Sequence, residues 1–212
     1  MMFPRSILSI VREIFVAAIA TLIALSALGC GGGADSRARM YTLRLPDPPA
    51  SPPPSSNLTI GVEHFSAVTP LNDQRILRYE SPTQVKYYDE DHWVSEPTTM
   101  IPEFAAHYLE RMGIARQASL LPWVESMDYV LQGQILNFEE VHDGSQHEAR
   151  VALELTLLRF PKREAVWTGT FRARQPIAGN NAPAAVEALS LATQAALKSG
   201  FEDLAENLKP HP

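Results

Sequence analysis

The feature that most restricts the fold is a long run of alternating apolar and polar residues in the second half of the chain. From residue 149, the odd positions are apolar and most of the residues between them are polar, and the same alternation returns from 165 to 173 after a turn at 161–163. A period of two places every apolar side chain on one face of a strand. Together with an apolar segment over 129–141, this predicts a three-stranded antiparallel meander with one buried face.

The first strand of this meander is irregular. Its apolar phase slips near Ile135-Leu136, which predicts a β-bulge, and Asp143-Gly144 then predicts a turn. Glu139 and Glu140 are adjacent, so their side chains should point to opposite faces of the sheet. We therefore expect these two carboxylates not to act as a pair.

Two segments carry apolar residues at helical spacing. The first, with a candidate cap at Thr99 and an end at Gly113, has its apolar face formed by Ile101, Phe104, Ala105, Tyr108, Leu109 and Met112. The second is capped by Asn181, and its apolar stripe comprises Val186, Leu189, Thr193, Ala196, Leu197, Leu204 and Leu208.

Shorter strands are expected over 40–45 and 58–65, with a hairpin formed by 75–80 and 83–88. Asp89-Glu90-Asp91 is interpreted as a solvated turn. The predicted fold class is α+β: a mostly antiparallel β-sheet with two main helices packed on it, in a single domain behind a lipidated tether.

The N-terminus differs from the rest of the chain. Arg5 and Arg12 precede an uncharged stretch over 14–28, the pattern of a secretory signal and short for a membrane-spanning helix. Ala27-Leu28-Gly29-Cys30 is similar to a lipobox, although that motif usually carries Leu at the place of Ala27. We therefore predict lipidation of Cys30, the only cysteine; an ordinary signal or an uncleaved anchor is the alternative.

This interpretation divides the chain into a signal peptide over 1–29, a lipidated flexible tether over 30–39 and a domain over 40–212. The domain includes a proline-rich segment over 46–56, whose six prolines favour an extended spacer.

Motifs for chemistry are few. The sequence has no Gly-x-Ser-x-Gly, Ser-x-x-Lys or His-x-x-x-His pattern. His142 and His147 could approach each other across the predicted turn, but no third ligand is evident, and 89–91 lacks the spacing of a calcium loop. We expect no enzymatic activity, no cofactor and no metal. A net charge of −6 gives no reason to expect a nucleic-acid partner.

Three aromatic residues stand near the acidic segment. Tyr87, Tyr88 and Trp93 could form an exposed contact patch for a partner protein or a lipid. The alternative is that these rings pack in the core.

The order of several short motifs carries a family resemblance. After Cys30 and the proline-rich segment come Val85-Lys86-Tyr87-Tyr88, Trp93, Glu96-Pro97 and Asp128-Tyr129-Val130-Leu131-Gln132-Gly133. In this order the chain resembles the ABC-type transport auxiliary lipoprotein family from about Tyr41 to Leu208.

The resemblance implies a non-catalytic periplasmic lipoprotein, anchored in the outer membrane by Cys30. It implies an auxiliary role in an MCE-type ABC lipid transport system between the inner and outer membranes. The implied partners are an MCE-domain protein and its ABC transporter or inner-membrane complex. The resemblance also allows a homo-oligomer. Gly31 after the lipidated cysteine agrees with outer-membrane sorting. The alternative is an accessory lipoprotein of another envelope machine, either a cell-wall synthase activator or an outer-membrane assembly factor.

Overall fold

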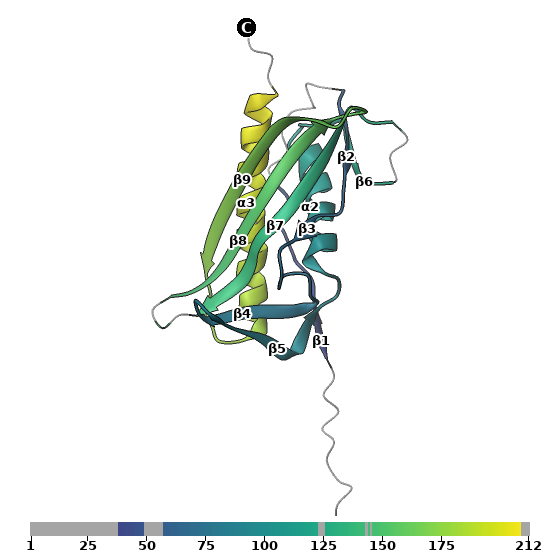
Figure 1. Cartoon of the computed structure of the whole chain (residues 1–212). Coiled ribbons are helices and arrows are strands. Elements are labelled where there is room, and N and C mark those ends of the chain that lie inside the picture. Colours follow the sequence, from purple (N-terminus) through teal and green to yellow (C-terminus); the bar gives the residue numbers. More distant parts are fainter. Residues whose placement is uncertain (1–37, 49–56, 123–125, 143, 145, 209–212) are drawn as a thin grey trace, which may run out of the picture. The chain divides into compact units, whose positions relative to one another are not determined.

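The computed structural model in Figure 1 describes residues 38–48, 57–122, 126–142, 144 and 146–208. The predicted signal peptide over 1–29, Cys30 and most of the tether lie outside these residues. So does most of the proline-rich segment.

The predicted meander is present and forms the long part of the sheet. Strand β7 (Tyr129–His142) pairs antiparallel with β8 (His147–Arg159), and β8 pairs antiparallel with β9 (Glu164–Pro176). The odd residues of β8 from Ala149 to Leu157 are buried, as their alternation predicts. Gly144 adopts a φ of 66° at the end of the β7–β8 hairpin.

A β-bulge in β7 changes which residues face the core. Ile135 lies opposite Leu153, but Asn137 lies opposite Ala152, so Leu136 is the extra residue and the predicted bulge is confirmed. Before the bulge the odd residues of β7 face the core. After it the even residues Phe138, Glu140 and His142 do so, since they lie opposite the odd residues Val151, Ala149 and His147.

The other side of β7 is a parallel edge made of short strands. β2 (Thr59–Val62), β3 (Ser66–Ala67) and β4 (Arg75–Ser81) each pair parallel with part of β7. β6 (Gln117–Leu120) continues the sheet beyond β2.

A hairpin formed by β4 and β5 (Gln84–Trp93) lies at the end of the sheet shown at the bottom of Figure 1. β5 pairs antiparallel with β4, and β1 (Arg39–Tyr41) pairs parallel with β5. The sheet is therefore mixed, with antiparallel pairing along its longest strands.

Both helices lie on the same face of the sheet, behind the strands in Figure 1. α2 (Pro97–Arg111) packs against β2 and β6, and α3 (Ala182–Asn207) packs against β8 and β9. This arrangement confirms the predicted α+β fold class. No helix among the described residues is long and apolar enough to cross a membrane.

The ends of the two helices test the predicted caps at Asn181 and Thr99 and the predicted end at Gly113. Asn181 accepts a hydrogen bond from the Ala184 backbone N–H at 3.0 Å, so this predicted cap is confirmed. Gly113 follows α2 with a φ of 70°, as expected of a residue that ends a helix. The cap at Thr99 was wrong: α2 begins at Pro97, whose fixed φ suits a first helical position, and Thr99 lies inside the helix.

Two strand predictions also need correction. The strand predicted over 40–45 is only Arg39–Tyr41, although Leu43 and Leu45 are buried. Residues 89–91 are not a solvated turn, because β5 runs through them to Trp93 and the side chain of Asp91 is buried. Pairing with β1, which supplies Arg39 as a charge partner, makes this acidic strand possible.

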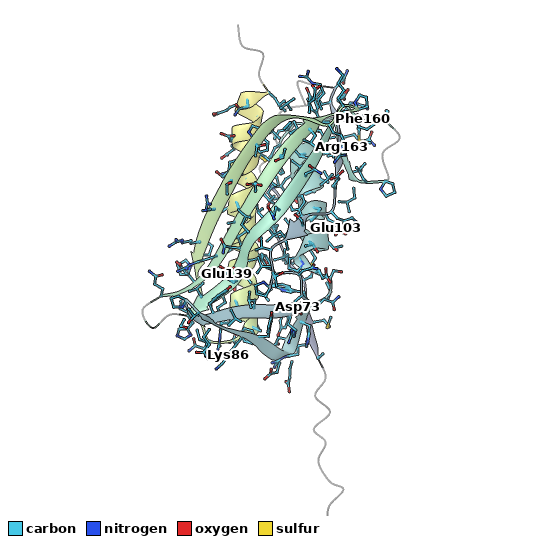
Figure 2. The ribbon with its side chains drawn as sticks, viewed as in Figure 1. Asp73, Lys86, Glu103, Glu139, Phe160 and Arg163 are labelled. Carbon is cyan, nitrogen blue, oxygen red and sulfur yellow. The ribbon has the colours of Figure 1, made fainter. Side chains whose placement is uncertain are left out.

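The tip between β8 and β9 is joined to the parallel edge. The Arg163 guanidinium lies 2.8 Å from a carboxylate oxygen of Glu63, which follows β2. Phe160 is exposed at this tip, at the end of the sheet far from Lys86 (Figure 2).

Candidate functional site

The three aromatic residues singled out from the sequence have different environments. Trp93 is 2% exposed and packs against Phe138 with ring centroids 5.4 Å apart, so it belongs to the core and is wrong as a surface contact residue. Tyr87 and Tyr88 are half-buried. The guanidinium of Arg75 lies over the Tyr87 ring at 3.9 Å from its centroid.

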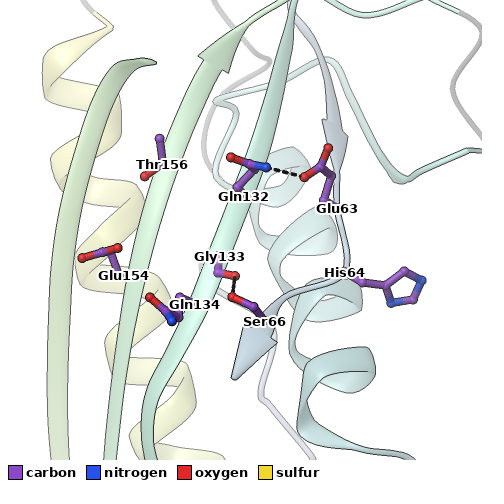
Figure 3. Close-up of a pocket in the computed structure, with 8 residues that line it drawn as sticks. All are labelled: Glu63, His64, Ser66, Gln132, Gly133, Gln134, Glu154 and Thr156. Atoms are coloured by element: carbon purple, nitrogen blue, oxygen red, sulfur yellow. Dashed lines mark hydrogen bonds between the residues drawn. The ribbon is translucent and has the colours of Figure 1, made fainter. Parts of the chain in front are cut away.

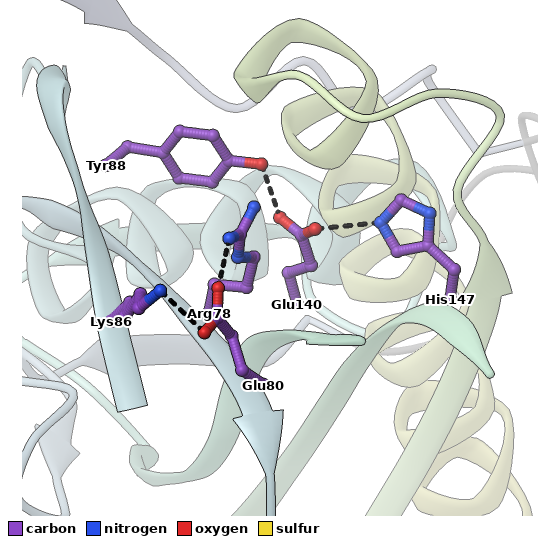
Figure 4. A network of polar contacts seen from close by, with 6 residues as sticks. All are labelled: Arg78, Glu80, Lys86, Tyr88, Glu140 and His147. Carbon is purple, nitrogen blue, oxygen red and sulfur yellow. Dashed lines mark hydrogen bonds and ion pairs between the residues drawn. The ribbon is translucent and has the colours of Figure 1, made fainter. Parts of the chain in front are cut away.

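Tyr88 contacts the buried carboxylate of Glu140, which lies at the centre of a polar network (Figure 4). Its hydroxyl donates to Glu140 Oε2 at 2.7 Å, and His147 Nε2 lies 2.8 Å from Glu140 Oε1. Glu140 is 1% exposed. Burial, and then the hydrogen bond to Glu140, raise the pKa of Tyr88 to about 12, so the phenol keeps its proton.

Arg78, which lies opposite Glu140 in the β4–β7 pairing, and Lys86 of β5 are both held by a different carboxylate. Lys86 Nζ lies 2.7 Å from Glu80 Oε2, and Arg78 forms an ion pair with the other oxygen of Glu80. The hydrogen bonds from Lys86 and then from Arg78 lower the pKa of Glu80. The Arg78 guanidinium also stands 5.5 Å from the centroid of the Tyr88 ring.

His142 completes the group on the core-facing side. Its ring stacks on that of His147 with centroids 4.6 Å apart and planes at 24°. One ligand atom from each of Glu140, His142 and His147 lies within 4.8 Å of the others. A cavity of about 390 Å³ opens beside them, lined by Arg78, Glu80, His142, Gly144 and Asn180.

Glu139 takes no part in this group. It lies on the other face of β7, where it accepts hydrogen bonds from Asn137 Nδ2 at 2.8 Å and from the Phe138 N–H at 3.0 Å. Burial raises its pKa above the ordinary value. The prediction that Glu139 and Glu140 point in opposite directions is confirmed.

Sequence reasoning found His142 and His147 but missed Glu140 as their third partner. Glu140 and His142 are two residues apart on one strand, and such residues share a face. The bulge and the hairpin then place His147 on that face. Strand periodicity, rather than a consecutive motif, is the signal that identifies the group.

A second polar cavity lies on the helix-free face of the sheet (Figure 3). Gln132 Nε2 donates to Glu63 Oε2 at 2.6 Å, and the Ser66 hydroxyl lies 3.5 Å from the Gly133 carbonyl oxygen. Glu154 and Thr156 of β8 complete the wall of this cavity of about 350 Å³.

An apolar groove lies between the segment after β1 and α3. Its volume is about 670 Å³, and its lining includes Leu45, Pro46, Pro183, Val186 and Leu191. Leu191 is one of the exposed large hydrophobic residues of the described chain. The hydroxyl of Tyr108 donates to the Pro46 carbonyl. This hydrogen bond attaches the wall that contains Leu45 and Pro46 to α2.

Buried polar side chains of the described residues are nearly all satisfied. His92 Nδ1 is the one buried side-chain nitrogen or oxygen among them without a hydrogen-bond partner.

Comparison with known proteins agrees with the resemblance. The family model described as the ABC-type transport auxiliary lipoprotein component matches residues 41–199. The chain belongs to this family. Membership makes the protein a lipoprotein component of ABC-type transport, as expected from the order of its motifs. No curated protein sequence matches this chain.

Solved structures show the same fold. The protein XCC0632 from Xanthomonas campestris is 20% identical, with a TM-score of 0.70 over 79% of this chain and 95% of that one. The hypothetical protein CT253 from Chlamydia trachomatis is 8% identical, with a TM-score of 0.50 over 72% of this chain and 98% of that one.

Proposed function

We propose that this protein is a non-catalytic lipoprotein of the outer membrane that assists an MCE-type ABC system in moving lipid between the inner and outer membranes. The observation that carries the proposal is the family match over residues 41–199, which spans nearly the whole predicted domain. The ABC-type transport role is that of the family; the MCE partner, the lipid cargo and the outer-membrane location are the proposed part.

The polar side chains of Figure 4 have a structural role in the domain. In this network, each carboxylate is engaged by neighbouring donors: Glu80 by Arg78 and Lys86, and Glu140 by Tyr88 and His147. The proposal of a non-catalytic role rests on the family match, which describes an auxiliary transport component.

The anchor is proposed to be the lipidated Cys30, followed by Gly31. Two or more acyl chains hold a protein stably to a membrane, whereas one binds only marginally. Anchoring also concentrates the domain near a partner, so a weak contact is sufficient. Replacing Cys30 by serine should abolish acylation and cleavage, observed as a larger, unlipidated chain by mass spectrometry. Normal processing of this variant would refute the anchor.

The partner is tested by crosslinking in intact envelopes, followed by purification of the tagged full chain. An MCE-domain protein with its ABC transporter subunits should be recovered. Recovery of cell-wall synthases or outer-membrane assembly proteins in their place would favour the alternative role in another envelope machine.

The contact surface can be examined in the same experiment. Tyr87 and Tyr88 remain the proposed contact residues, and Tyr87 is the better one to replace because Tyr88 supports Glu140. We expect Tyr87→Ala to reduce recovery of the partner. Phe160→Ala, an exposed aromatic residue at the other end of the sheet, is the matched control and should leave recovery unchanged.

A further inference from the structure

We propose that Glu140, His142 and His147 form a binding site for a divalent transition-metal ion of the zinc, nickel or cobalt type. The site lies where the β7–β8 hairpin meets β5 and the start of α3. It is separate from the proposed transport role, which does not require a metal.

The three side chains already lie close to the positions that metal ligands require. The three ligand atoms lie within 4.8 Å of one another, and His147 Nε2 and Glu140 Oε1 are already 2.8 Å apart. Ligands bonded to zinc at 2.0–2.2 Å stand roughly 3.0–3.5 Å from one another. A small rotation of the two half-buried histidine rings brings all three within reach of one ion.

The pairing of β7 with β8 brings the three ligands together. Glu140 and His142 share a face of β7 because they are two residues apart after the bulge, and His142 lies directly opposite His147 in the hairpin. The ligands therefore come from two paired strands, whose register sets their separation. Sites built on strands hold their ligands more rigidly than sites built on loops.

The donor set selects the class of ion. Two imidazole nitrogens and one carboxylate oxygen suit zinc and the neighbouring transition metals, whereas calcium and magnesium prefer oxygen ligands alone. Neutral imidazole is the ligand, so binding replaces the His147–Glu140 hydrogen bond. In a neutral ring the hydrogen on the coordinating nitrogen is exchanged for one on the other nitrogen, whereas a protonated ring releases one proton to solvent.

Neighbouring residues are placed to support the ion. The Tyr88 hydroxyl holds Glu140 Oε2 at 2.7 Å, which leaves Oε1 for the metal and fixes the orientation of the carboxylate. Glu80 pairs with Arg78 and Lys86, so its negative charge offsets the charge of these two cations on the neighbouring strands. The adjoining cavity provides access for the ion and room for water in its remaining coordination positions.

The test is titration of the full-length chain with Zn²⁺ alone, followed by calorimetry and by the shift in melting temperature. One bound ion with a raised melting temperature is expected. His142→Phe keeps a ring stacked on His147 but removes both nitrogens, and it should abolish this binding without unfolding the domain. Tyr88→Phe should weaken binding by roughly 10- to 100-fold, the usual effect of losing a residue that orients a ligand.

His64→Ala is the matched control, because His64 is an exposed histidine at the other polar cavity and should not affect the affinity. Cys30 is present in every variant, so any binding by its thiol is common to all of them. Cobalt(II) gives an independent readout, since its visible spectrum should change in the wild type and not in His142→Phe. The proposal is overturned if Zn²⁺ fails to bind the wild type, or binds His142→Phe with unchanged affinity.

Discussion

Arg39 and Asp91 lie opposite each other in β1 and β5 and are joined by two parallel hydrogen bonds. Arg39 Nε donates to Asp91 Oδ1 at 2.7 Å, and its Nη2 donates to Oδ2 at 2.8 Å. Asp91 is buried, whereas Arg39 is largely exposed. This pair attaches β1, which begins at the last residue of the predicted tether over 30–39, to the β4–β5 hairpin.

Replacing Asp91 by alanine should lower the free energy of unfolding by about 1–2 kcal/mol, because two charge-assisted hydrogen bonds are lost. The measurement is urea denaturation of the full chain followed by circular dichroism. Glu164→Ala is the control: its pair with Lys162 is 4.0 Å long and exposed, and such pairs contribute little. Equal effects of the two substitutions would contradict a structural role for the Arg39–Asp91 pair.

Gly200 should not tolerate even a methyl group, although alanine normally favours a helix. A Cβ at this position would stand 2.9 Å from Phe171 Cδ2 and 3.0 Å from Leu155 Cδ1, where α3 packs on the sheet. We expect Gly200→Ala to destabilise the fold by about 1–2 kcal/mol, measured by the same denaturation.

Ser199→Ala is the matched control, since Ser199 is the exposed neighbour of Gly200 in α3 and the substitution should be neutral or slightly stabilising. Phe171→Leu should reduce the cost of Gly200→Ala, because it shortens the ring that the new methyl group meets. Additive effects of the two substitutions would mean that Phe171 is not the obstacle.

Asp203 should anchor α3 to β9 through Trp167. Its Oδ2 accepts a hydrogen bond from the Trp167 indole N–H at 2.7 Å. Asp203→Ala leaves this mostly buried donor without a partner and should cost about 1–2 kcal/mol, whereas Asp203→Asn keeps an acceptor and should cost less. Tryptophan fluorescence during denaturation follows both variants. Equal losses would imply that the negative charge, rather than the hydrogen bond, is needed.

Glu139 should make stability decrease with rising pH. Burial raises its pKa above the ordinary 4.5, so the folded protein binds this proton more tightly than the unfolded chain does. The resulting stabilisation is complete below the ordinary pKa and is lost as the pH rises through the raised pKa of the fold. In Glu139→Gln this part of the decrease should disappear.

Denaturation midpoints measured from pH 4 to pH 8 test this expectation. The glutamine can keep both hydrogen bonds if the Asn137 amide turns its oxygen toward the new NH₂ group. Glu154→Gln serves as the comparison, because Glu154 lies on the same helix-free face of the sheet. A profile of Glu139→Gln that is parallel to the wild type would show that Glu139 does not titrate in this range.

Much of the fold follows from local patterns in the sequence. Alternation over 149–173, the phase slip at Ile135-Leu136 and the cap at Asn181 each predicted an element or irregularity that the structure contains. These signals are reliable because side-chain periodicity and capping depend only on residues close together in the chain. The family was also accessible in this way, through the order of its short motifs.

Other features depend on partners that are distant in sequence. The parallel pairing of β2, β3 and β4 with β7 has no local signal, and Asp91 could be buried in β5 only because Arg39 lies opposite it. The same holds for the group formed by Glu140, His142 and His147. Their sequence specifies two strands and a bulge, but burial of Glu140 against Tyr88 requires β4 to pair with β7 on one side and with β5 on the other. Strand pairing and burial are decided by contacts across the whole domain, and only the tertiary structure brings these three residues together.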